Sequence, residues 1–91
     1  MLSGTTLTIV GRHAFQTARL KPDERIYLQR ETNNPHDANA IAAYKTDGQI
    51  IGHVRRKVAA VIAPNMGVNE RSYGSVHSGH AGRWKCSVLL E

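Results

Sequence analysis

The fold is decided by the stretch from Ala40 to Val54, which reads AIAAYKTDGQIIGHV. Its two ends, Ala40–Tyr44 and Gln49–Val54, are short apolar runs bounded by polar residues, as is typical of strands. Between them stands the segment Lys45–Gly48, and its Asp-Gly pair is the strongest short signal of a β-hairpin. The stretch therefore predicts two antiparallel strands.

Two further strands are predicted upstream of this hairpin. In Thr5–Val10, apolar residues alternate with β-branched threonines, which favours a first strand. In Arg25–Glu31, Ile26 and Leu28 lie on one face of a second strand. The next residues, Thr32–Asp37, are so rich in turn formers that they predict an exposed polar loop.

One short helix is predicted downstream, because the apolar period changes from Arg55 onward. The apolar residues at helical spacing are Val54, Val58, Val61 and Ile62. The helix is expected to end or kink around Ala63-Pro64, since proline disrupts a helix interior.

The remaining residues predict a final hairpin. Two alternating runs, Ser72–Ser78 and Arg83–Leu90, flank the turn segment Gly79–Gly82. One face of the last run carries Trp84, Cys86, Val88 and Leu90, which we expect in the core.

These segments make about six short strands and one short helix, with no internal repeat and no linker. A strand-rich chain must cover its sheet edges, and closure into a small twisted barrel does so within about 90 residues. The sequence therefore predicts one domain, residues 1–91, of mainly β class: a small OB-like barrel of about six strands with one short helix.

Composition narrows the class of partner. Twelve Lys and Arg against seven Asp and Glu leave a net charge of +5, so a polyanion is the first partner to test. The single cysteine, Cys86, excludes an intramolecular disulfide and a cysteine-rich zinc site. With no run of eighteen apolar residues and no leader-like start, we expect a cytoplasmic protein that does not span a membrane.

Four segments follow one another between Leu28 and Met66: LQRE, NNPHDANAI, DGQIIGHVRR, and residues 59–66. Together they resemble the HIRAN domain family. That family has a strand ending in a basic and an acidic residue, an Asn-Pro-aromatic-Asp-x-Asn-Ala-Ile/Val turn, a hairpin ending in Ile-Gly-aromatic/His-Val/Leu, and a basic helix start. Val10-Gly11 also fits the family's opening, and the resemblance fades beyond Gly67.

The resemblance implies a modified OB fold that binds single-stranded DNA, in some members at a free 3′-hydroxyl end. Such domains occur alone in bacteria and phages, which is the type expected here, or fused to Snf-type helicase-like ATPases. The DNA-binding positions that it implies, together with the neighbouring basic residues, are His13, Phe15, His36, Asp37, His53, Arg55, Arg56 and Lys57.

Two interpretations are open for the residues of the polar loop. Asp37 either organises the turn through backbone N–H groups or, as the family implies, accepts a hydrogen bond from the terminal 3′-hydroxyl. His36 stands where many members carry an aromatic ring. Its imidazole either stacks on a base, more weakly than the about 1–3 kcal/mol of an aromatic platform, or is an exposed side chain without a ligand.

The basic cluster after the hairpin also has two interpretations. His53 is either half-buried beside Ile51 or, by the resemblance, near a phosphate together with Arg56. Three consecutive basic residues, Arg55, Arg56 and Lys57, oppose the dipole at a helix start, which favours a ligand over a merely solvated basic face.

Other residues that could bind DNA or a metal give weaker signals. Arg12, His13 and Phe15 fall where the family clamps the strand, but Phe15 is equally well a lid over one barrel end. Arg83 and Lys85 are expected to point outward beside the groove. A zinc site made of His77, His80 and Cys86 is rejected, because strand residues three apart face opposite sides and the ligand set is incomplete.

The leading hypothesis is a non-catalytic module for single-stranded DNA in repair or replication-fork processing, with no cofactor. The rival is a protein-interaction adaptor for a helicase-like ATPase supplied in trans. A metal-dependent nuclease built on His36, Asp37 and His53 is disfavoured, since one carboxylate is too few for a divalent cation site. The oligomeric state and the choice between DNA and RNA are open.

Overall fold

A computed structural model describes residues 3–11, 20–21, 23–81 and 85–91, with side chains except at residues 77–81 and 85. Its elements, in chain order, are β1 (Thr6–Val10), β2 (Arg25–Arg30), β3 (Ile41–Lys45), β4 (Ile50–Val54), α2 (Arg56–Ile62), the 3-10 helix η1 (Ala63–Asn65), β5 (Ser72–Ala81) and β6 (Lys85–Leu90). The predicted mainly β class with one short α-helix is confirmed for these residues.

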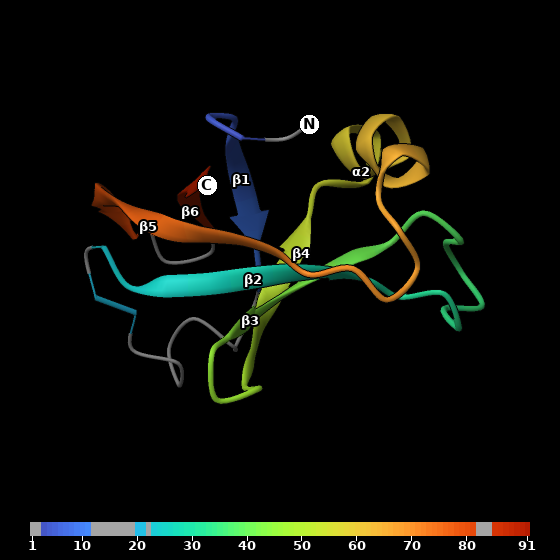
Figure 1. The fold of residues 1–91 in the computed structure, drawn as a ribbon, viewed down its shortest axis with the longest axis horizontal. Helices are drawn as coiled ribbons and strands as arrows, with labels where there is room; N and C mark the ends of the chain where they lie inside the picture. Colours follow the sequence, from blue (N-terminus) through green and yellow to red (C-terminus); the bar gives the residue numbers. More distant parts are fainter. Residues whose placement is uncertain (1–2, 12–19, 22, 82–84) are drawn as a thin grey trace.

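The strands form a closed barrel in the order β1-β4-β3-β2-β5-β6, in which every pairing is antiparallel (Figure 1). Pairing of β6 with β1 runs from Thr6↔Leu89 to Val10↔Lys85, and pairing of β1 with β4 closes the circle at Ile9↔Val54. Closure pairs both edges of each described strand, which is the reason a barrel was expected. Figure 1 shows α2 and the β2–β3 loop on the same side of the barrel.

The core is formed by the inward positions of all six strands and by the small residues that follow β4. Alternation in β1 and β2 is as predicted, since Ile9, Ile26 and Leu28 are fully buried. The buried cluster consists of Leu7, Ile9, Ile26, Leu28, Ile41, Ala43, Ile51, Val54, Ala59, Ala63, Met66, Val76, Cys86, Val88 and Leu90. Trp84, which we expected on the same face as Cys86, lies outside the described residues.

Close strand approach explains two glycines of the barrel. A Cβ atom on Gly52 would lie 2.4 Å from the carbonyl oxygen of Val10, and one on Gly74 would lie 2.6 Å from that of Leu89. Both neighbours are backbone atoms of a paired strand, so a larger residue would force the strands apart. These glycines allow β4 to pack against β1 and β5 against β6.

The predicted apolar face of the helix is correct at its two ends and wrong between them, since Val54 is buried in the core and Ile62 packs against it. Val58 and Val61 are 37% and 70% exposed, and the buried residue of α2 is Ala59, followed by Ala63 in η1. Alanines let the helix lie close against the end of the barrel, where a stripe of valines would hold it further away. The predicted helix end is confirmed, because α2 stops at Ile62 and the next turn is 3-10.

The predicted boundary of the fifth strand is also wrong. β5 continues to Ala81 through part of the expected turn, and Gly82 lies outside the described residues. The β5–β6 register shifts between Val76 and Ala81, and Ala81 then pairs with Cys86. The shift falls in a segment that contains Gly79, and glycine in a strand commonly accompanies such a bulge.

Candidate nucleic-acid interface

The loop after β2 is held by side chains that bind its own backbone. Asn34 Oδ1 accepts the N–H groups of His36 at 2.9 Å and Asp37 at 3.1 Å, and Asp37 Oδ1 accepts the N–H of Asn39 at 2.9 Å. The Glu31 N–H donates to the Ala40 carbonyl at 2.8 Å and closes the loop. These contacts confirm that Asp37 organises the turn, and they leave its second carboxylate oxygen for other partners.

Arg56, the first residue of α2, contacts this loop. Its Nη2 donates to the His36 carbonyl at 3.2 Å, and its Nε lies 3.8 Å from Asp37 Oδ2. The arginine side chain is 79% exposed, whereas that of Asp37 is 21% exposed. Because an exposed ion pair of this length contributes little stability, the contact mainly sets the position of a solvent-accessible cation beside the turn.

His53 lies on the outer face of β4, opposite Ala42 of β3. Its Nε2 donates to Glu31 Oε1, and the two side chains are 44% and 31% exposed. His53 is therefore half-exposed, as one of the two interpretations required, but its partner is a carboxylate. From the sequence, Glu31 was expected only as the acidic end of a motif strand. Its pairing with His53 was not predicted, and it places a negative charge within the expected basic groove.

A cleft of about 570 Å³ extends from the loop over the outer surface of β2 and β3. Its lining includes Glu31, Asn34, His36 and Tyr44. Arg30 also lines it, and this residue donates from Nη1 to the Met66 carbonyl at 3.3 Å while its buried Nε has no hydrogen-bond partner. The sequence singled out neither Asn34 nor Tyr44, although an asparagine directly before proline is a recognisable turn signal.

Of the other predicted site residues, two basic ones lie at the start of α2, and the rest lie outside the described residues. Arg55 and Lys57 are exposed at the start of α2, and Arg55 is the N-cap without a side-chain capping bond. The first turn of α2 carries no acidic residue, so its charge still opposes the helix dipole. His13 and Phe15 lie outside the described residues, as do Arg12 and Arg83.

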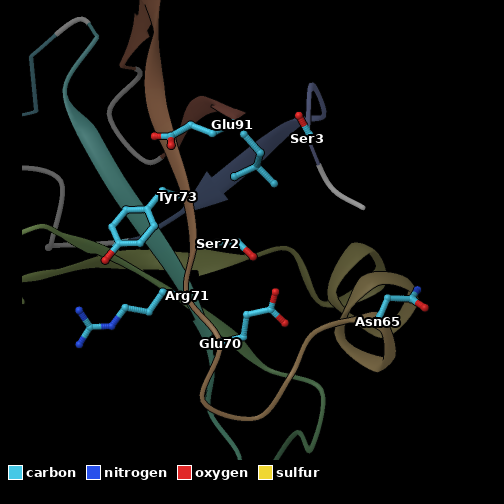
Figure 2. A pocket seen from close by; sticks show the side chains of 8 residues that line it. Ser3, Asn65, Glu70, Arg71, Ser72, Tyr73 and Glu91 are labelled. Atoms are coloured by element: carbon cyan, nitrogen blue, oxygen red, sulfur yellow. The ribbon is translucent and has the colours of Figure 1, made fainter.

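A second cleft, of about 400 Å³, lies between η1, the start of β5 and the end of β6 (Figure 2). Its lining residues include Asn65, Glu70, Arg71, Tyr73 and Glu91. Glu70 and Glu91 disfavour a polyanion at their part of this cleft, and the loop cleft is therefore the better candidate for the anchored end of a polyanion.

Neither a metal site nor a membrane-spanning helix is found among the described residues. Among them, no three His, Cys, Asp or Glu side chains gather as they would around a metal ion. The side chains of His77 and His80 are not part of that description. No helix in the described part of the chain is long and apolar enough to cross a membrane.

Fold and site together define a class: a small closed β-barrel whose β2–β3 loop contacts the basic start of a short helix and forms a polar surface with it. The model of the HIRAN domain family matches residues 4–90, and the chain belongs to this family.

Curated relatives support the same assignment. The chain is 38% identical over 63 residues to the helicase-like transcription factor of Mus musculus, which is 69% of this chain and 6% of that protein. It is 40% identical over 50 residues, 55% of this chain, to a putative SWI/SNF-related matrix-associated actin-dependent regulator of chromatin subfamily A member 3-like 1 of Arabidopsis thaliana. The chain thus spans about 6% of the length of these relatives.

Solved structures share the barrel. The crystal structure of the HIRAN domain of human HLTF superimposes with a TM-score of 0.74 at 22% identity, covering 98% of this chain and 74% of that one. A crystal structure of a protein from Lactobacillus plantarum gives 0.69 at 24% identity, covering 93% and 87%. The NMR structure of the HLTF HIRAN domain in its DNA-bound conformation gives 0.64 at 26% identity, covering 93% and 70%.

Proposed function

We propose that this domain binds single-stranded DNA, with a free 3′-hydroxyl end seated at the β2–β3 loop, and that it does so without catalysis. The observation that carries the proposal is the contact of Arg56 with the His36-Asp37 turn in a member of the HIRAN family. The DNA-bound conformation of the HLTF HIRAN domain supports the class of ligand. A role in DNA repair or fork processing and a cytoplasmic location stay predictions.

Each loop residue has a role that suits its chemistry. Arg56 binds a phosphate, because its exposed guanidinium offers paired donors in a fixed plane, and His53 assists it. The exposed imidazole of His36 contacts a base. Asp37 accepts the hydrogen bond of the terminal hydroxyl, and its negative charge repels a terminal phosphate. Arg55, Lys57, His13 and Phe15 complete the proposed set.

Fluorescence anisotropy with three oligonucleotides of one sequence tests the proposal. One carries a 3′-hydroxyl, one a 3′-phosphate, and one is circular. We expect the 3′-hydroxyl oligonucleotide to bind tightest and its affinity to fall steeply with salt, because phosphate contacts release counterions. Equal binding of all three would refute the end preference, and salt-independent binding would refute phosphate contacts. A ribonucleotide version of the first oligonucleotide compares RNA with DNA.

A second function is favoured by one observation. Val58 and Val61, three residues apart on α2, are 37% and 70% exposed, so apolar side chains lie on the surface of the helix. Exposed apolar residues of this kind suit an adaptor that docks on a helicase-like ATPase in trans. Co-purification of the helicase-like ATPase that survives nuclease treatment, and that is lost in a Val58→Ser, Val61→Ser variant, would support the adaptor. Loss of the ATPase on nuclease treatment would favour DNA binding.

A further inference from the structure

Three tyrosines form a row across the outer surface of β3, β2 and β5. Tyr27 is paired in register with Tyr44 on one side and with Tyr73 on the other. The Tyr27 and Tyr44 rings are stacked with centroids 5.2 Å apart, and those of Tyr27 and Tyr73 are tilted and 5.7 Å apart. Since the neighbours Ile26 and Leu28 point into the core, the three rings of this tyrosine row point outward.

Two arginines lie on the rings of the row. The guanidinium of Arg71 is 4.4 Å from the centre of the Tyr27 ring, and that of Arg25 is 4.2 Å from the centre of Tyr73. Figure 2 shows the side chains of Arg71 and Tyr73 on the same side of the chain, whereas Glu70 points to the other side. Arg71 is exposed while Tyr27 is 6% exposed, so a cation forms the outer layer above the middle ring.

The tyrosine row is continuous with the loop cleft. Tyr44 lines that cleft together with Glu31 and His36. Burial raises the pKa of Tyr44, and the charge of Glu31 raises it further, so the ring stays a neutral phenol beside that carboxylate. Glu31 directly follows β2, four residues after Tyr27, which is about 13 Å in an extended chain.

Aromatic rings flanked by arginines match the two chemical parts of single-stranded DNA, its bases and its phosphates. Bases stack on aromatic faces without regard to sequence, and phosphates bind the adjacent cations. Tyr44 and Tyr73 are partly exposed and Arg71 and Arg25 are exposed, so the surface is accessible. Arg25 also donates two hydrogen bonds to the Glu91 carboxylate, at 2.8 and 3.0 Å, so its position above Tyr73 has a structural cause. Arg71 is therefore the cation on which the inference rests.

We propose that the tyrosine row with Arg71 binds the nucleotides on the 5′ side of the one held at the β2–β3 loop. The single-stranded DNA runs from the β2–β3 loop over Tyr44 toward Tyr73, with its bases against the tyrosine rings and its phosphates against Arg71. The inference rests on the proposed function, because the loop supplies the anchored end. It adds a binding surface on the barrel wall and a direction for the strand.

The test measures affinity against length for oligo-dT of two, four, six and eight nucleotides with a 3′-hydroxyl. We compare the unaltered domain with the Arg71→Gln and Tyr73→Leu variants. Lys21→Gln is the matched charge control, since Lys21 is exposed and lies outside the row. We expect affinity to rise with length in the unaltered domain and the control, and this gain to fall roughly tenfold in the variants. Binding of the dinucleotide is expected to stay unchanged.

The outcomes separate the two proposals. An equal length gain in the unaltered domain and in Arg71→Gln overturns the tyrosine row as a binding surface, and so does the absence of any length gain in the unaltered domain. Failure of the unaltered domain to bind any of the oligonucleotides overturns the proposed function itself. Thermal unfolding of each variant checks the fold, and Arg71→Gln, an exposed change outside the strands, keeps the test decisive if Tyr73→Leu unfolds.

Discussion

Arg56 donates from Nη2 to the carbonyl oxygen of His36 at 3.2 Å, across twenty residues of chain. The arginine begins α2, and the histidine stands in the loop between β2 and β3. The contact joins the helix to the loop, and it leaves a guanidinium that is 79% exposed within reach of a ligand. The loop and the helix start are therefore one surface.

Replacing Arg56 with glutamine is expected to weaken binding of a 3′-hydroxyl oligonucleotide roughly tenfold, because one phosphate contact is lost. The slope of log affinity against log salt should fall by about 1. Anisotropy titrations at several salt concentrations measure both quantities. Lys21→Gln removes the same charge elsewhere and should change neither by more than about twofold. An unchanged salt slope in the Arg56 variant would show that Arg56 does not contact phosphate.

Asp37→Asn is expected to reduce the preference for a 3′-hydroxyl over a 3′-phosphate end severalfold. The amide oxygen still accepts the Asn39 N–H, so the loop keeps its shape, but the charge that repels a phosphate is gone. Asp47→Asn is the matched control, because its Oδ1 accepts the Gln49 N–H at 2.9 Å in the same kind of turn. Competition between the two oligonucleotides gives the ratio directly, and an unaltered ratio would assign Asp37 a structural role alone.

Glu31→Gln is expected to raise affinity for single-stranded DNA roughly fivefold at neutral pH. The carboxylate that pairs with His53 lines the cleft, and its removal relieves about 1 kcal/mol of repulsion toward a phosphate. Glutamine can still accept the hydrogen bond from the imidazole. The same anisotropy titration measures the change, and weaker binding would mean that Glu31 serves to orient His53.

Cys86 is expected to be unreactive in the folded protein. Its side chain is 1% exposed, and burial raises its pKa from 9.0 to about 11, so about one thiol in a thousand is ionised at pH 8. A thiol-specific chromogenic reagent should react only as the barrel opens, and fully in denaturant. Because the pKa of Cys86 is higher in the folded than in the unfolded protein, its contribution to the free energy of unfolding is fully present below pH 9. This contribution declines as the pH rises from 9 toward 11. Rapid reaction of the native protein at pH 8 would contradict this.

Gly52→Ala is expected to destabilise the barrel by about 1–3 kcal/mol, the usual range for overpacking. The added Cβ would meet the Val10 carbonyl at 2.4 Å, and the two strands would have to separate. Urea unfolding measures the change. Thr46→Ala, in the exposed turn of the same hairpin, serves as the control and should leave the midpoint nearly unaltered. An equal effect of the two substitutions would contradict the close approach of β1 and β4.

Local sequence patterns were sufficient to predict most of the strands and the helix, but not all of their boundaries and buried faces. Alternation in β1 and β2 and the Asp-Gly turn before β4 are properties of neighbouring residues, and these strands lie within a residue of the prediction. The helix was located correctly, yet its buried face was only partly correct: Val54 and Ile62 contact the core, whereas Val58 and Val61 are exposed. A seven-residue helix has too few apolar positions to define one face. The end of β5 depended on pairing with β6, which no local pattern contains.

By itself, the sequence determined the mainly β class, the short helix, the polar loop and the resemblance that named His36, Asp37, His53 and Arg56. Each of these follows from residues close together in the chain. Tertiary structure alone decided that Glu31 holds His53, that Arg56 reaches His36, and that tyrosines of three strands form one row. Such contacts join residues more than fifteen positions apart, and they depend on strand register and barrel closure, which local propensities do not specify.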